Sequence, residues 1–130
     1  MRYLKKEYPD KSFYSVIEEF SESFTFRINS YEDLWLLKQI KDVYDFNGKN
    51  AEILIPFIFD AQADRRFNSN ESSNLKLVCK FINEMKWKQL SVFHHHNAEV
   101  VESLIDNVEI ILNVNFIIND LQNLVDNGNK

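Results

Sequence analysis

A nearly continuous apolar run at residues 53–59, Ile-Leu-Ile-Pro-Phe-Ile-Phe, constrains the fold more than any other feature of the sequence. A strand with one face in water alternates apolar and polar residues, whereas this run is apolar almost throughout. Strands of this kind are buried on both faces, as in the middle of a parallel sheet covered by helices. The run therefore predicts an α/β fold, with further strands and helices on either side of it.

Strand and helix patterns alternate along the rest of the chain. At residues 23–29, Phe24, Phe26 and Ile28 alternate with polar residues, which predicts a half-buried strand. Ser30 followed by Asp33 forms a capping box, which predicts the start of a helix. That helix is expected over residues 31–46 and is ended by Asn47 and Gly48. Further strands are predicted at residues 12–17, 51–59, 90–93 and 108–112, and further helices at 74–88, 97–105 and 117–125.

The predicted order is β-β-α-β-loop-α-β-α-β-α, within a single domain of 130 residues. This order is typical of a mainly parallel sheet with helices on both faces, a three-layer sandwich. In such sheets ligands bind at the carboxyl ends of the strands. Residues 29–30, 60–67 and 94–97 are therefore expected to lie along one edge of the sheet.

Composition narrows the classes of function. The chain has only two glycines, Gly48 and Gly128, so a glycine-rich phosphate loop is excluded. A net charge of -5 argues against a nucleic-acid partner, and no apolar stretch is long enough to cross a membrane. The single cysteine, Cys79, lies in an apolar helical stripe and is expected in the core. These features together predict a cytoplasmic protein.

A charged segment directly follows the central apolar strand. Asp60, Asp64, Arg65 and Arg66 place two carboxylates and two guanidinium groups within seven residues. Arginine offers a rigid fork of donors for phosphate oxygens, so this segment is a candidate site for a phosphorylated ligand. The alternative is a solvated loop with local ion pairs.

Three adjacent histidines follow the next strand. Neighbouring side chains in an extended segment point to opposite sides, so only His94 and His96 can share a face. Two ligands make a weak zinc site, and a single histidine acting at the sheet edge is favoured over a metal cluster. A third segment, residues 8–12 (Tyr-Pro-Asp-Lys-Ser), reads by itself as a turn before a strand.

Taken in order, these segments resemble the N-terminal domain of the ribose-phosphate pyrophosphokinases, the phosphoribosyl pyrophosphate synthetases. That family has an F-x-D-G-E motif, then a strand running into P-Y-x-x-x-R-Q-D-R/K-R/K. A helix of the type S-A-K-L-V-A follows, and then a strand ending in D-L-H or D-P-H. The counterparts here are residues 8–12, 55–66, 73–79 and 91–97, so the likeness covers about residues 8–125.

The resemblance implies a role for each matching residue. The first motif reaches the adenine of ATP across a subunit contact, and Asp10 matches its acidic residue. Asp64, Arg65 and Arg66 match the D-R/K-R/K of the nucleotide-holding motif. His96 matches the histidine that lies by the phosphates and magnesium, and so carries the catalytic and metal roles. Mg²⁺ with ATP, or another nucleotide, and a homo-oligomer are the cofactor and partners implied.

Several positions depart from the family pattern. Gln62 and Ala63 stand where the nucleotide-binding R-Q pair is expected, which removes a cation, although Gln62 keeps a nucleotide-binding position. Ser12 replaces the glutamate of the first motif, and His94 replaces the aspartate before the histidine.

Family members also have a C-terminal catalytic domain with the loop D-D-x-x-x-T-G-G-T, which binds ribose 5-phosphate, and no such loop occurs here. The resemblance thus implies a nucleotide-binding and oligomerisation domain that does not transfer diphosphate alone, because the transfer needs both substrates held in line. One alternative is a non-catalytic regulatory or assembly module, favoured by the 18 aromatic residues. The other is a generic α/β domain whose likeness is accidental.

Overall fold

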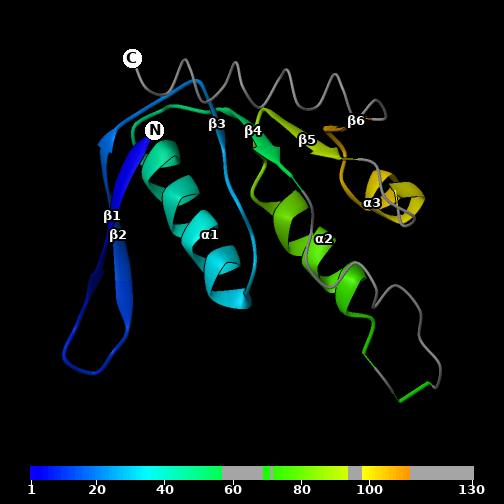
Figure 1. Ribbon diagram of the computed structural model, residues 1–130, viewed down its shortest axis with the longest axis horizontal. Helices are drawn as coiled ribbons and strands as arrows, with labels where there is room; N and C mark the ends of the chain where they lie inside the picture. The colour runs from blue at the N-terminus through cyan, green and yellow to red at the C-terminus, as the bar shows by residue number, and fades with distance from the viewer. Residues whose placement is uncertain (57–68, 71, 94–97, 112–130) are drawn as a thin grey trace.

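The computed structural model describes residues 1–56, 69–70, 72–93 and 98–111 (Figure 1). Within these ranges six strands and three helices follow one another along the chain. They are β1 (Arg2–Glu7), β2 (Phe13–Glu19), β3 (Ser23–Thr25), α1 (Tyr31–Phe46), β4 (Glu52–Ile55), α2 (Asn74–Glu84), β5 (Gln89–Phe93), α3 (Ala98–Leu104) and β6 (Val108–Ile111).

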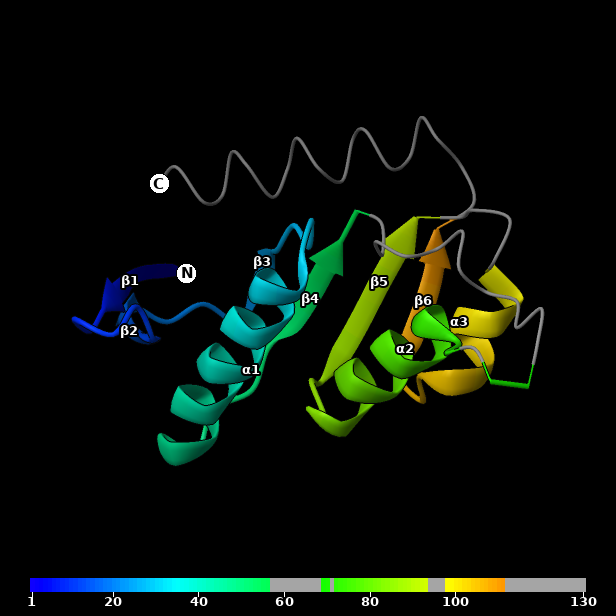
Figure 2. The same ribbon diagram turned by 90° about the horizontal axis from the view of Figure 1, so that it is seen from below.

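The centre of the molecule is a parallel sheet of four strands in the order β3-β4-β5-β6, so the predicted α/β architecture is confirmed. Ile53 of β4 pairs with Phe24 on one side and Leu90 on the other, which makes β4 an inner strand as the apolar run predicts. Each crossover adds the next strand in the same direction. Since such crossovers are right-handed, α1, α2 and α3 lie on one face (Figure 2). The helix predicted at residues 117–125 lies outside the described residues.

The core lies between this sheet and the three helices. Tyr44 of α1 is fully buried, and its ring contacts those of Phe20, Phe24 and Trp87 at centroid distances of 5.0, 6.0 and 5.4 Å. The Tyr44 hydroxyl donates to the Ser21 carbonyl at 2.8 Å, so its polar end is satisfied. Cys79 is fully buried as expected, and burial raises the pKa of its thiol to about 12, which leaves it unreactive.

Helix α1 begins and ends where the sequence predicts. The Ser30 hydroxyl accepts from the Asp33 amide at 3.2 Å, and the Asp33 carboxylate reaches back to the Asn29 amide at 2.9 Å. Beyond Asn47, Gly48 has a φ of 66°, a left-handed conformation that ends a helix and favours glycine.

The N-terminal region differs from the prediction. The strand predicted at residues 12–17 is present as β2, over Phe13–Glu19. It pairs antiparallel with β1 in a separate two-stranded sheet, and β1 was not predicted. The sequence of β1, Arg-Tyr-Leu-Lys-Lys-Glu, lacks an alternating apolar pattern because nearly all of it is exposed. The strand predicted at residues 23–29 is also shorter, since β3 ends at Thr25.

Helix α2 is shorter than predicted, ending at Glu84 rather than at residue 88. Lys86 takes a φ of 60°, the left-handed conformation that turns the chain out of a helix. This turn brings Trp87, which is only 2% exposed, into the core. The helical periodicity through Met85 concealed the stop, because the residue at the left-handed position is a lysine rather than a glycine.

Candidate functional site

Two of the predicted site segments leave the sheet from neighbouring strands. Ile55 at the end of β4 pairs in register with Val92 of β5, and the two strands are parallel. The chain after each strand therefore starts from the same edge of the sheet. The side chains predicted to act there, Gln62, Asp64, Arg65, Arg66 and His96, lie outside the described residues, and their roles stay predictions.

The third predicted segment of this edge, residues 29–30, is described. The Phe26 amide donates to the Leu54 carbonyl at 2.9 Å, so the chain beyond β3 follows β4 toward that edge. Helix α1 then begins at Tyr31, with its N-terminus facing the edge. The Asp33 carboxylate beside it is engaged by the Asn29 amide. The polar groups of this segment serve the helix cap.

Asp10 lies in the turn of the β1–β2 hairpin. Pro9, Asp10 and Lys11 form a three-residue loop, in which the Lys11 amide donates to the Tyr8 carbonyl at 2.9 Å. The Asp10 carboxylate accepts from both the amide and the hydroxyl of Ser12, at 3.0 and 2.6 Å. These two hydrogen bonds lower the pKa of Asp10, so the group is a carboxylate at neutral pH. The interpretation of this segment as a turn is confirmed.

Lys11 has a φ of 73°. A hairpin with a three-residue loop places its third loop residue in the left-handed region, where glycine is the favoured residue. The F-x-D-G-E motif that residues 8–12 resemble has glycine at this position.

Two tyrosines flank the hairpin turn and were missed as a pair by sequence reasoning. The rings of Tyr8 and Tyr14 lie 4.9 Å apart, and their side chains are 53% and 37% exposed. The two residues are six positions apart, and only the hairpin register brings them together. The pair forms an exposed aromatic surface that can stack against a flat ring.

The hairpin lies to one side of the molecule, with α1 and β3 between it and the strands β4 and β5 (Figures 1 and 2). Polar contacts fasten it to α1. Lys5 pairs with Glu32 at 3.0 Å, and this contact raises the pKa of Lys5. Gln39 accepts from the Ser15 hydroxyl and donates to the Phe13 carbonyl. Asp10 therefore does not lie at the edge where the other predicted site segments begin.

An apolar groove of about 280 Å³ runs between α1 and α2 and was not predicted. Trp35 and Leu77 remain 50% and 58% exposed beside it, unusually high fractions for large apolar side chains. Its wall consists of Tyr31, Leu34, Trp35, Leu77, Val78 and Phe81. The sequence signal was present, since Trp35 and Leu77 fall outside the buried stripe of each helix.

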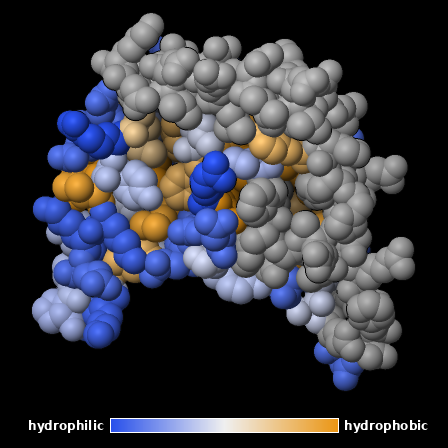
Figure 3. All heavy atoms as spheres, viewed as in Figure 1, coloured by the Kyte–Doolittle hydropathy of each residue, from blue (hydrophilic) through white to orange (hydrophobic). Residues whose placement is uncertain are grey.

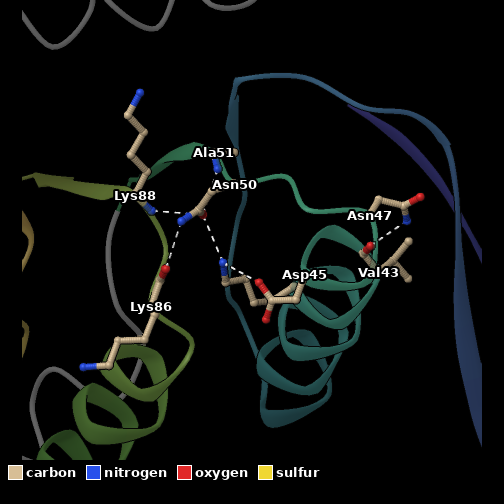
Figure 4. Close-up of polar contacts among 8 residues, drawn as sticks. Val43, Asp45, Asn47, Asn50, Ala51, Lys86 and Lys88 are labelled. Carbon is tan, nitrogen blue, oxygen red and sulfur yellow. Dashed lines mark hydrogen bonds and ion pairs between the residues drawn. The ribbon is translucent and has the colours of Figure 1, made fainter.

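A polar cluster joins the chain at the opposite edge of the sheet, where β4 and β5 begin (Figure 4). The Asn50 side-chain oxygen accepts from Lys41, from the Ala51 amide and from the Lys88 amide, and its amide nitrogen donates to the Lys86 carbonyl. Lys41 is 4% exposed and also pairs with Asp45 at 2.9 Å. The Asn50 side chain and the Lys41 ammonium are both engaged within the protein, so the cluster is structural.

No group of three or more potential metal ligands comes together among the described residues, and His96 lies outside them. None of the described helices has the length and apolar character needed to span a bilayer.

The geometry defines an α/β fold with a parallel sheet of four strands. No protein-family profile and no curated protein matches the sequence. Among solved structures, the fold matches that of phosphoribosylpyrophosphate synthetase from Mycobacterium smegmatis, with a TM-score of 0.65 and 12% sequence identity. The match covers 85% of this chain and 39% of the synthetase chain. The likeness shows a phosphoribosylpyrophosphate synthetase-like fold, and this chain spans well under half of that protein's length.

Proposed function

We propose that this chain is the nucleotide-binding and oligomerisation domain of a ribose-phosphate diphosphokinase-like protein. The observation that carries the proposal is the agreement between four ordered motifs and the fold. The segments that resemble the family's nucleotide motifs follow β4 and β5, and the fold that holds them resembles that of a phosphoribosylpyrophosphate synthetase. A complete protein of this kind would transfer diphosphate from ATP to ribose 5-phosphate.

The hairpin supports the same proposal. It carries Asp10 in its turn and the exposed rings of Tyr8 and Tyr14 beside the turn, on the far side of α1 from β4 and β5. The resemblance implies a motif that serves the nucleotide of a neighbouring subunit, and a projecting hairpin fits that role. Lys11 adopts the conformation that the glycine of the motif would favour. In this proposal the tyrosine rings stack on the base, while Asp64, Arg65, Arg66 and His96 act on magnesium and phosphate.

Titration calorimetry with magnesium-ATP tests the proposal. We expect weak binding to the chain and its loss in a variant carrying both Asp64→Ala and His96→Ala. Lys80→Ala, on the solvent face of α2, is the control and should bind as the parent does. Absence of any heat with the parent chain would contradict a surviving nucleotide site.

A second candidate function is a non-catalytic assembly module, and the groove between α1 and α2 favours it. Large apolar side chains left exposed beside a groove mark surfaces that bind other proteins. Gln62 and Ala63, which replace the R-Q pair, point the same way because they remove a cation from the nucleotide site.

A further inference from the structure

The solvent-facing stripe of α1 continues beyond the groove and has an unusual makeup. With 100° between successive residues, Tyr31, Trp35, Lys38, Asp42 and Phe46 fall on one side of the helix. Their spacing of four, three, four and four residues is close to the repeat that helices use when they pack along one another. Phe46, at the end of the stripe, is 90% exposed. The stripe thus has an apolar wall at one end, an exposed aromatic ring at the other and two opposite charges between them.

The two charges of the stripe, Lys38 and Asp42, have no ion-pair partner among the described residues. Lys38 and Asp42 are four residues apart on the same helix, yet they form no ion pair with each other or with any other residue in the described ranges. Nearby α1 charges are used differently, since Glu32 pairs with Lys5 and Asp45 pairs with Lys41. Lys38 and Asp42 are therefore available to pair with an acidic and a basic side chain of a partner.

We infer that the partner of this stripe is the α1 helix of a second copy of the chain, packed antiparallel about a two-fold axis near residue 40. In a two-fold contact, a residue that meets another is met by it in return. Lys38 and Asp42 lie two residues on either side of residue 40, so each faces the opposite charge on the second copy. Leu34 and Phe46 lie six residues on either side, so Phe46 of each copy reaches the groove of the other.

One axis thus satisfies both the charge pairing and the apolar fit. The groove lining includes Leu34, at the level where Phe46 of the second copy arrives, and its volume of about 280 Å³ can receive an aromatic ring. A parallel arrangement would instead bring Lys38 against Lys38 and Asp42 against Asp42. Like charges in contact are unfavourable, so the charge order selects the antiparallel form.

The inference deepens the second proposed function, an assembly module, and rests on it. It does not depend on nucleotide binding, because the stripe and the hairpin lie on separate elements. The contact involves one helix and one groove from each copy, so we expect a weak dimer with a dissociation constant on the order of micromolar.

Sedimentation velocity of the chain at increasing concentration tests the inference. The parent should pass from monomer to dimer, and Trp35 fluorescence should shift to shorter wavelength as its ring leaves water. Lys38→Asp or Asp42→Lys alone should weaken the dimer about tenfold, since each places two like-charged pairs in the contact. The double charge swap should restore association, because it recreates both pairs in reversed order. Phe46→Ser should weaken the dimer at least about tenfold through loss of the ring from the groove.

Lys76→Asp, on α2 and outside the stripe, is the matched control for the change in net charge and should associate as the parent does. A parent that stays monomeric, or a double swap that stays as weak as the single variants, would overturn the inference. Circular dichroism of each variant establishes that it is folded. Calorimetry with magnesium-ATP on Phe46→Ser separates the two proposals, because Phe46 is not among the residues proposed to bind the nucleotide and its loss should leave that binding in place.

Discussion

The sheet with its helices and the β1–β2 hairpin differ in how far their side chains are buried. In the sheet region, rings such as Tyr44 and Trp87 are almost wholly buried against one another. In the hairpin, every residue of β1 except Tyr3 is exposed, and Figure 3 shows hydrophilic residues over most of that side of the molecule. The hairpin is attached to the rest of the molecule by polar contacts to α1, which are individually weak, and by Tyr3, Phe13 and Ile17, which are only partly buried against the core. The difference suggests that the sheet region determines stability, while the hairpin can vary for function.

Truncating a core ring should have the largest effect. Trp87→Ala removes a side chain that contacts Phe24 and Tyr44, and should lower the free energy of unfolding by about 3–5 kcal/mol. Urea denaturation followed by circular dichroism measures the change. Trp87→Phe should cost much less, because the indole nitrogen has no hydrogen-bond partner among the described residues. Tyr14→Ala in the hairpin should cost about 1 kcal/mol or less. Equal losses of unfolding free energy for Trp87→Ala and Tyr14→Ala would contradict this difference between the two regions.

Removing the Asn50 side chain should have an intermediate effect. Asn50→Ala leaves the buried Lys41 ammonium with one polar partner fewer and the Lys88 amide without its bond to the Asn50 side chain. Because Asn50 itself is exposed and water can replace part of this network, we expect a loss of about 1–2 kcal/mol in urea denaturation. Asn47→Ala removes a hydrogen bond only to Val43 of its own helix. It should lower the free energy of unfolding by a few tenths of the loss expected for Asn50→Ala. A larger loss at Asn47 would contradict the structural role of the cluster.

Lys11→Gly should stabilise the hairpin slightly. The left-handed conformation of Lys11 is strained for a residue with a side chain, and relief of that strain outweighs the added freedom of glycine in the unfolded chain. We expect a gain of about 0.5–1 kcal/mol, seen as slower hydrogen exchange of the Tyr8 amide, which donates across the turn to Ser12. Slower exchange at Tyr8 with an unchanged urea midpoint would show that the hairpin opens separately from the sheet, which would make the difference between the two regions clearer.

The smallest expected effect is the response of the turn to acid. The Ser12 hydrogen bonds lower the pKa of Asp10 in the folded state below its unfolded value of about 3.9. The turn is therefore fully stabilised above that value and loses this contribution as the pH falls through the lowered pKa. Carbon-13 spectra of the Asp10 carboxyl and the chemical shift of the Ser12 amide should titrate together. In Asp10→Asn the Ser12 amide should show no such transition, and a transition that persists would assign it to another group.

The sequence was sufficient for the elements whose patterns are local. The apolar run at residues 53–59 identified β4 as an inner strand, and the Ser30–Asp33 capping box located the start of α1 to the residue. At the candidate site, the turn around Asp10 was predicted, because a proline and an aspartate before a strand have strong local preferences. The roles of the residues after β4 and β5 rest on the resemblance and stay predictions.

Tertiary contacts decided the remaining features. The lysine-rich segment of residues 2–7 forms β1 because it pairs with β2. Helix α2 ends before Trp87, whose ring packs in the core against Phe24. The tyrosine pair, the apolar groove and the contacts of Asn50 each join residues from different elements. Periodicity and capping report the conformation that a segment prefers for itself. Which distant segments meet depends on how the sheet and helices pack, and a single sequence carries no local signal for that.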